Sequence, residues 1–215
     1  MLTRRLEKIL SVVPKCEVLC DVGCDHGYVG IEALARNVAG QVIFCDISQP
    51  SLRKARENCP KGLKTRAQFV CRNGIGDICC DCAVIAGMGG LEIISVLQAA
   101  ERLPNTLVLQ PMRNQIDVRK WLQDSYQIVS DEKFLDGKYY DLIVAQKGSG
   151  DTLTYDEIKF GKSNLKRPTR DFASFINKEK EKYAKIRQST QSAEVEQNYA
   201  DVCRVSKQIE SEEQQ

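Results

Sequence analysis

The sequence has one histidine, His26, among its 215 residues. A structural zinc site usually needs histidines or a second cysteine pair at fixed spacing. The cluster Cys79-Cys80-Asp81-Cys82 has neither, so we do not expect it to bind a metal. Nine of the ten cysteines precede Ala83, and some, such as Cys20 and Cys45, lie in apolar runs. Cysteines in such runs are typical of core residues in a reducing compartment.

Long hydrophobic runs are also absent. No run approaches the ~18 apolar residues of a membrane-spanning helix, and the short run before Pro14 is no signal-peptide core. The net charge is only +2, and 42% hydrophobic with 28% charged residues is typical of a folded protein. We therefore expect a cytoplasmic protein that does not bind a membrane. We also expect no bound metal, and a monomer.

Strand-like and helical patterns alternate along the first two thirds of the chain. The strand-like runs are 17–22, 41–46, 67–72, 81–86 and 106–110, and the helical patterns are 2–12, 28–37, 50–58, 91–100 and 114–124. This alternation predicts an α/β fold, with a parallel sheet covered by helices on both faces. Two more strands, 126–134 and 139–146, are joined through Asp136-Gly137, a strong hairpin signal. A parallel sheet that ends in an antiparallel hairpin is typical of the class I methyltransferase variant of the Rossmann-like fold, with seven strands.

A linker at 147–151 precedes a different pattern. Apolar residues recur every three or four positions over 172–186 and again over 195–209. This spacing predicts two helices that form an antiparallel hairpin, or coiled coil, and Pro168 suits the start of the first. We therefore expect two domains, a Rossmann-like domain over 1–150 and a helical domain over 151–215.

The first strand ends in an acidic, glycine-containing segment, Asp21-Val22-Gly23-Cys24-Asp25-His26-Gly27. Glycine directly after a strand lets a ligand approach the backbone closely. The dinucleotide fingerprint G-x-G-x-x-G has glycine where this chain has Asp25, and an acid there opposes a pyrophosphate. The segment instead suits a cationic ligand such as S-adenosylmethionine. A structural turn that binds no ligand is the alternative interpretation.

Other strand ends supply further candidates. Asp46 lies twenty-three residues after Gly23, where an acid accepts hydrogen bonds from ribose hydroxyls, although it could also cap a helix. Asn73-Gly74 offers a side-chain amide for an adenine edge, or is a plain loop. The run Gly87-Met88-Gly89-Gly90 allows close approach of a flat base, and Gln110-Pro111-Met112 ends the next strand beside the same cleft.

The stretches 21–28, 86–90 (AGMGG), 109–111 (LQP) and 136–138 (DGK) together resemble the bacterial tRNA (adenine-22-N1)-methyltransferase family of the TrmK type. The similarity runs in order over about residues 3–147, and a helical tail also matches. It implies S-adenosylmethionine as methyl donor and N1 of adenine 22, in the D-loop region of tRNA, as acceptor.

The resemblance also implies donor-binding residues. They are Asp21, Gly23, Asp25, His26, Asp46, Asn73, Gly74, Gly87, Met88 and Gly89, and Ile47, next to Asp46, is included with them. The chain departs from the family over 72–75, where Gly-Asp-Gly-Leu is usual and this sequence has Arg-Asn-Gly-Ile. Asn73 keeps an acceptor oxygen for an adenine amino group but loses the charge.

Methyl transfer needs in-line approach of N1 to the sulfonium methyl, so most of the catalysis is positioning. A nearby carboxylate stabilises the cationic methyladenine and can receive a proton. Asp25 is the first candidate for this role, with His26 and Tyr28 shaping the pocket. The alternatives are donor binding alone for Asp25, helix capping for His26 and packing for Tyr28.

Basic and acidic residues are segregated along the chain. Residues 159–187 carry a net +7, residues 53–72 carry +6, and residues 194–213 carry −4. Such segregation predicts a phosphate-binding face. The RNA-binding candidates are Arg4, Arg5, Arg53, Lys54, Arg56, Lys166, Arg167 and Arg170. In the tail, the alternative is charge pairing between the two helices.

Three functions remain open at this point. The first is tRNA methylation. The second is a non-catalytic tRNA-binding protein on a methyltransferase shell, and the third is methyl transfer to another RNA or to a small molecule.

Overall fold

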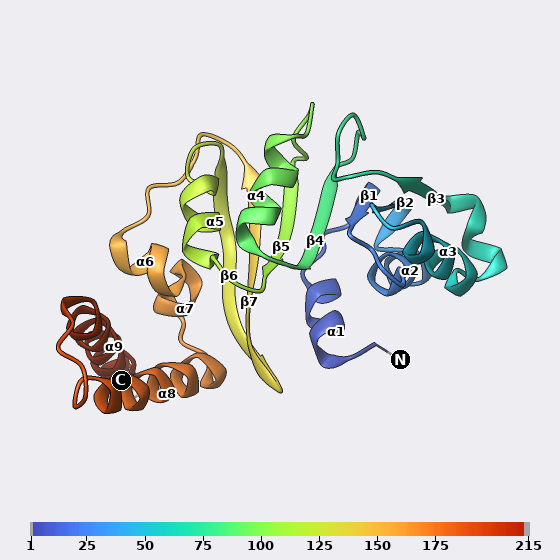
Figure 1. Cartoon of the computed structure of the whole chain (residues 1–215). Coiled ribbons are helices and arrows are strands. Elements are labelled where there is room, and N and C mark those ends of the chain that lie inside the picture. The colour runs from blue at the N-terminus through green and yellow to red at the C-terminus, as the bar shows by residue number, and fades with distance from the viewer. Residues whose placement is uncertain (1, 213–215) are drawn as a thin grey trace. The chain divides into compact units, whose positions relative to one another are not determined.

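The computed structural model describes residues 2–212 of this chain, which pack as two compact units (Figure 1). The first unit holds the residues up to 130 together with 141–152, and the second holds 131–140 together with the residues from 153 onward. The domain boundary expected at residue 150 lies close to this division. The hairpin tip, 131–140, however, packs with the C-terminal helices rather than with the sheet domain.

One sheet contains all seven strands that the sequence predicts. They are β1 (Cys16–Val22), β2 (Ala39–Asp46), β3 (Ala67–Cys71), β4 (Cys82–Met88), β5 (Thr106–Pro111), β6 (Tyr126–Asp136) and β7 (Lys138–Lys147), in the order β3-β2-β1-β4-β5-β7-β6. The first five strands pair in parallel, whereas β7 runs antiparallel to β5. Gly137, with φ +71°, makes the turn between β6 and β7. The predicted class I methyltransferase topology is therefore confirmed.

The central strands are buried on both faces, as their continuous apolar sequences predict. Leu19 of β1 lies beside Val42 of β2 on one side and Cys82 of β4 on the other, and all three are fully buried. Val84 of β4 pairs with Val108 of β5, so the buried centre of the sheet continues into β5. The core of the first unit therefore runs along the middle of the sheet.

Five α-helices accompany this sheet. They are α1 (Arg4–Ser11), α2 (Tyr28–Ala35), α3 (Gln49–Asn58), α4 (Gly90–Gln98) and α5 (Gln115–Leu122), and a short 3₁₀ helix, η1 (Lys61–Arg66), precedes β3. Parallel crossovers are almost always right-handed. Because the chain moves in opposite directions across the sheet from β1 to β2 and from β4 to β5, α2 and α4 cover opposite faces. The order reverses between β1 and β4, which is the switch point where such sheets bind ligands.

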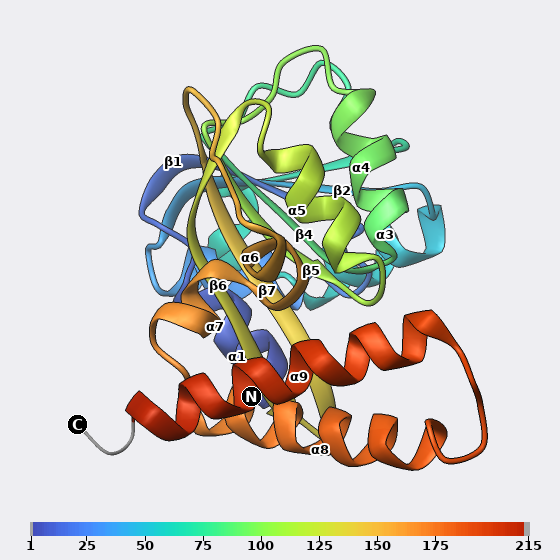
Figure 2. The ribbon, with the colours of Figure 1, turned by 90° about the vertical axis from the view of Figure 1, so that its left-hand side faces the viewer.

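The second unit is helical. It contains α6 (Tyr155–Phe160), α7 (Lys162–Lys166), α8 (Arg170–Ile186) and α9 (Ala193–Glu212). Figure 2 shows α8 and α9 side by side and antiparallel, and apolar residues such as Phe172, Ile176 and Val205 pack in a shared core. The predicted helical hairpin is confirmed. Thr169 caps α8 by accepting the N–H of Phe172, so Pro168 precedes the cap instead of starting the helix.

The cysteine cluster after β3 has a structural contact. The carboxylate of Asp81 accepts the backbone N–H groups of Glu17 and Val18, at 3.1 and 2.9 Å, and so holds the start of β1. No group of three or more metal-ligating side chains occurs within residues 2–212.

Across that same range, none of the helices combines the length and the apolar character needed to cross a membrane.

Candidate active site

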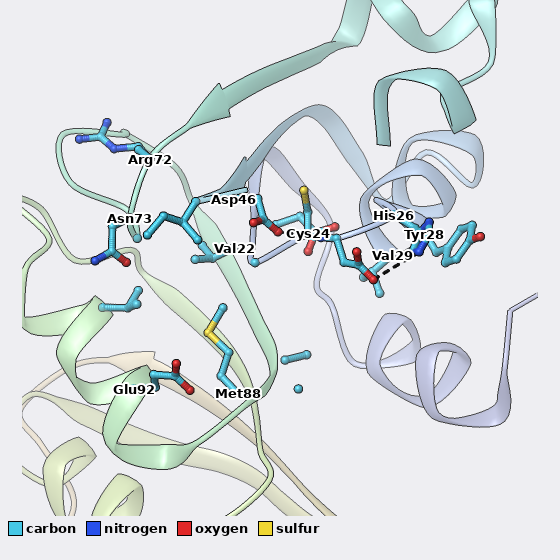
Figure 3. Close-up of a pocket in the computed structure, with 18 of the residues that line it drawn as sticks. Val22, Cys24, His26, Tyr28, Val29, Asp46, Arg72, Asn73, Met88 and Glu92 are labelled. Carbon is cyan, nitrogen blue, oxygen red and sulfur yellow. Dashed lines mark hydrogen bonds and ion pairs between the residues drawn. The ribbon is translucent and has the colours of Figure 1, made fainter. Parts of the chain in front are cut away.

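A cavity of about 740 Å³ opens at the switch point, where β1, β2 and β4 end (Figure 3). Its walls come from these strand ends, from the turn after β3, and from parts of α1 and α4. His26 and Tyr28 lie side by side at one end of the view, and Arg72 and Asn73 lie at the other. Of the residues predicted from the sequence to bind the donor, those that line it are Asp21, Gly23, Asp25, His26, Asp46, Ile47, Asn73, Gly74, Gly87 and Met88.

The loop between β1 and α2 is tight because three of its residues are left-handed. Gly23 has φ +66°, Asp25 has φ +46° and Gly27 has φ +72°. A Cβ at Gly23 would also collide with the terminal methyl group of Met88. The left-handed backbone at position 23 therefore favours glycine, whereas the Met88 methyl group is the end of a flexible side chain that can move aside. Asp25 holds a conformation that most non-glycine residues avoid.

Asp46 joins the end of β2 to this loop. Its Oδ2 accepts the backbone N–H of Asp25 at 3.0 Å, and its Oδ1 accepts that of Ser48 at 2.8 Å. A carboxylate oxygen can accept more than one hydrogen bond. Asp46 thus orders the loop and still has acceptor capacity for a ribose hydroxyl.

Asp21 is a buried carboxylate in the cavity wall, only 5% exposed. Burial raises its pKa to about 6, the charge of Asp46 adds to the rise, and the hydrogen bond from Gly30 N–H, at 3.0 Å, opposes it. Two neighbouring carboxylates in a partly desolvated wall favour a cation there. These two carboxylates therefore fit a ligand that carries a sulfonium and an ammonium group.

The three catalytic candidates lie together at the cavity. His26 Nε2 is 3.6 Å from Asp25 Oδ2, and the rings of His26 and Tyr28 stack at 5.4 Å with an interplanar angle of 7°. The N-cap of α2 is Gly27, so the capping role considered for His26 does not hold. Tyr28 is 48% exposed, which does not fit the packing role considered for it.

Ile47, directly after β2, adds an aliphatic side chain to the lining, and the turn after β3 adds Asn73 and Gly74. Ile47 is 71% exposed although it is aliphatic. Gly74 lies close to Val96 of α4, and its carbonyl accepts the thiol of Cys45 at 3.0 Å. An exposed aliphatic side chain in the cavity suits the flat face of a base.

The structure adds cavity residues that the sequence analysis did not identify as such. They include Leu6, Cys24, Arg72, Glu92, Ser95 and Val96. Gly89, in contrast, is not part of the lining: it is the N-cap of α4, and its N–H donates to Glu92 Oε2 at 3.2 Å. A glutamate three residues after a helix cap is a recognisable start signal, so the sequence did offer this clue.

The RNA-binding candidates of the first unit lie in two places. Arg53, Lys54 and Arg56 are exposed on α3, and the Arg56 guanidinium lies 4.7 Å from the centre of the Phe69 ring. Arg4 is exposed at the start of α1, whereas Arg5 lines the cavity.

Two arginines that add to the charge of 53–72 have structural partners. Arg66 donates to the carbonyls of Gly40 and Ala39 at 2.7 and 2.6 Å, and Arg72 forms an ion pair with Asp77. The positive charge available to RNA on this segment is therefore smaller than the sequence implies.

In the second unit, Lys166, Arg167 and Arg170 are exposed around the start of α8. Within the described residues, none of the three forms an ion pair. Other cations of 159–187 are neutralised internally: Lys159 contacts Asp201 at 2.6 Å, Lys182 contacts Glu179 at 2.9 Å and Arg187 contacts Glu196 at 2.7 Å. Charge pairing between α8 and α9, the alternative considered for the tail, therefore occurs at Arg187 and Glu196, while a phosphate-binding role of Lys166, Arg167 and Arg170 stays a prediction.

Comparison with known proteins places this geometry in context. A family model described as a methyltransferase domain matches residues 2–143. The tRNA (adenine(22)-N(1))-methyltransferase of Bacillus subtilis (strain 168) is 31% identical over 205 residues, which span 89% of this chain and 83% of that protein.

Solved structures of similar proteins share the fold of this chain. A Streptococcus pneumoniae protein in complex with S-adenosyl-L-methionine has a TM-score of 0.85 at 28% identity, with 96% of this chain and 100% of that chain covered. TrmK of M. capricolum, in complex with S-adenosyl-homocysteine, shares the fold with a TM-score of 0.80 at 23% identity, over 98% of this chain and 97% of that chain.

Proposed function

Because this chain belongs to the tRNA (adenine(22)-N(1))-methyltransferase family, we propose that it transfers a methyl group from S-adenosylmethionine to N1 of adenine 22 in tRNA. The observation that carries the proposal is the buried Asp21 carboxylate beside Asp46 in the cavity at the switch point. An acidic wall favours a cationic donor and disfavours a pyrophosphate.

The chain's own residues would hold the donor as follows. The sulfonium supplies the methyl group as an electrophile. Asp21 and the backbone around Gly23 accommodate the positively charged end, and Asp46 accepts hydrogen bonds from the ribose. Ile47, with the Asn73-Gly74 turn, contacts the base. These assignments rest on the lining of the cavity and on its charge.

Asp25, His26 and Tyr28 would contact the adenine that accepts the methyl group. The carboxylate of Asp25 is exposed to the cavity and stabilises the positive charge that methylation creates on adenine, or receives its proton. The stacked rings of His26 and Tyr28 offer a platform against which an extruded base can lie.

The exposed cations would bind the RNA backbone. Arg4, Arg53, Lys54 and Arg56 in the first unit, and Lys166, Arg167 and Arg170 in the second, are the candidates. Contacts of this kind give affinity without sequence information, so they place the tRNA and leave recognition of the adenine to the cavity.

We also propose that the enzyme acts in the cytoplasm and as a monomer. All ten cysteines, each within the described residues, are free thiols, which suits a reducing compartment. Light scattering of the purified protein measures its mass in solution and so tests whether it is a monomer.

The decisive experiment is methyl transfer from labelled S-adenosylmethionine to an unmodified tRNA transcript, with mass-spectrometric mapping of the product. We expect one 1-methyladenosine at position 22 and none when that adenine is replaced by guanine. Binding of tRNA without transfer would indicate a non-catalytic protein. Transfer to another position, another RNA or a small molecule would contradict the proposed acceptor.

A further inference from the structure

The segments that follow β4 and β5 are joined beyond the ends of these two strands. The N–H of Met112 donates to the carbonyl of Met88 at 2.8 Å, and the N–H of Gly90 donates to the carbonyl of Arg113 at 2.9 Å. A Cβ at Gly90 would lie only 2.5 Å from the carbonyl oxygen of Asn114, so this approach leaves room for glycine alone. The backbone therefore holds the two segments together as one surface.

Residues 88–91 and 112–116, which we call the ledge, lie directly beside the cavity. Met88, at the start of the ledge, and Glu92, which follows it on α4, both line the cavity. Figure 3 shows these two side chains on the same side of it. The rest of the ledge is not part of the lining, so it borders the cavity.

Three apolar side chains of the ledge are exposed. They are Leu91 at the start of α4, Met112 after β5 and Ile116 at the start of α5, and Leu91 is the most exposed of them at 59%. Single exposed apolar residues are common on protein surfaces, but several on one small surface are typical of a contact with another molecule. Aliphatic and thioether side chains of this kind suit the flat face of an unstacked base.

Arg113 adds a cation to the ledge. Its side chain is exposed and lies over Gly89, with Nε 3.1 Å from the point that a Cβ on this glycine would occupy. Within residues 2–212, Arg113 forms no ion pair. The nearby carboxylate of Glu92 accepts the N–H of Gly89 at 3.2 Å, at the cap of α4. The planar donors of an exposed guanidinium match the oxygens of a phosphate.

We propose that the ledge binds the nucleotide next to the target adenosine, with the connecting phosphodiester on Arg113 and the base against the apolar side chains. The inference rests on the proposed function, because it requires RNA as the acceptor. A nucleotide that enters the cavity leaves its covalent neighbour at the border of the cavity, where the ledge lies. The lining carries the carboxylates of Asp21, Asp25, Asp46 and Glu92, which disfavour a phosphate inside the cavity and favour one on a cation outside it.

The first test measures the binding of an unmodified tRNA transcript in the presence of S-adenosyl-homocysteine. Arg113→Met should weaken binding about tenfold and lower the slope of log K against log salt by about 1. Arg113→Lys should keep the slope, because it keeps the charge. Unchanged affinity and slope in Arg113→Met would overturn the proposal.

The matched control for this test is Arg102→Met. Arg102 is also exposed, but it lies between α4 and β5, at the edge of the sheet opposite to the cavity. Its replacement removes the same charge from the protein and should change neither the affinity nor the salt slope.

The second test changes the RNA. A neutral methylphosphonate replaces the phosphate on the 5′ side or on the 3′ side of adenosine 22, and one of these two positions should weaken binding to the wild type about tenfold. The same position should cause no further loss with Arg113→Met. No loss at either position, or an equal loss with both proteins, would overturn the proposal. A methylphosphonate several nucleotides away is the control.

The contact with the base has its own test. The double variant Leu91→Gln, Ile116→Gln should bind tRNA about tenfold more weakly than the wild type. This difference should disappear when the nucleotide joined to adenosine 22 through the sensitive phosphate lacks its base. An undiminished difference with this abasic tRNA would overturn the contact.

Further measurements separate a failure of this inference from a failure of the proposed function. Thermal unfolding and calorimetry with S-adenosyl-homocysteine should give wild-type values for Arg113→Met, because its side chain is exposed and outside the cavity lining. If the wild-type enzyme methylates no tRNA, the proposed function fails. If it methylates adenine 22 and Arg113→Met binds tRNA as the wild type does, only this inference fails.

Discussion

Asp46 Oδ2 accepts the backbone N–H of Asp25 at 3.0 Å, so the last residue of β2 holds the loop that follows β1. The same carboxylate accepts the N–H of Ser48 at 2.8 Å. A residue expected to bind ribose thus also fixes the conformation of the main catalytic candidate. Donor binding and loop order should therefore be lost together.

Replacement of Asp46 tests this coupling. Asp46→Ala leaves two backbone N–H groups without their acceptor, and we expect a loss of about 1–3 kcal/mol in the free energy of unfolding. Affinity for S-adenosyl-homocysteine, measured by calorimetry, should fall at the same time. Ser48→Ala is the matched control, because it removes the cap of α3 and should cost about 1 kcal/mol without affecting the donor. Unchanged donor affinity in Asp46→Ala would refute the assignment of Asp46.

Asp25 requires a replacement that respects its backbone. At φ +46°, asparagine is tolerated far better than alanine, so Asp25→Asn removes the charge with little strain. We expect single-turnover methyl transfer at saturating donor to fall about 100-fold or more in Asp25→Asn. Asp25→Ala should lose the same activity and also about 1 kcal/mol of stability. Normal turnover in Asp25→Asn would exclude Asp25 from the chemistry.

The raised pKa of Asp21 predicts pH-dependent donor binding. Because a cationic donor favours the ionised carboxylate, binding should release a proton near pH 6, and affinity should rise between pH 5 and 7. Calorimetry in two buffers of different ionisation enthalpy measures the released proton. Asp21→Asn should bind more weakly and lose this part of the pH dependence. A wild-type affinity for the donor that does not change across pH 5–7 would contradict this role of Asp21.

The same shift predicts how the stability of the ligand-free protein changes with pH. The folded state holds the Asp21 proton up to a pKa of about 6, whereas the unfolded chain releases it near the ordinary aspartate pKa of 3.8. This contribution to stability is therefore greatest below pH 4 and is lost as pH rises to 6, by about 3 kcal/mol. Urea unfolding of the wild type and Asp21→Asn across this range isolates the contribution of this one group.

The exposed cations at the start of α8 predict a salt-dependent RNA contact. Replacement of Lys166, Arg167 and Arg170 by glutamine should weaken tRNA binding and reduce the slope of log K against log salt by about 3. Lys182→Gln is the control, because Lys182 already contacts Glu179. An unchanged salt slope in the triple variant would show that these residues do not contact phosphate.

The order of strands and helices follows from the sequence alone, because the pattern of apolar residues within each element is local. The buried strands, the Asp136-Gly137 turn and the two long C-terminal helices all carry periodicities or turn residues that a short window reveals. The helices η1, α6 and α7 have six residues or fewer and give no such pattern. The acidic loop after β1 was equally visible, since its residues are consecutive.

Only the tertiary structure decided which charged residues are available for function. Arg66 resembles its basic neighbours in the sequence, yet it binds the backbone carbonyl of Gly40 in another segment. Arg5 was expected on an RNA-binding surface, but it lines the cavity and contacts Gln110. The physical reason is that a side chain's partner depends on where distant segments cross, and hydrophobic periodicity specifies the burial of an element without specifying its neighbours.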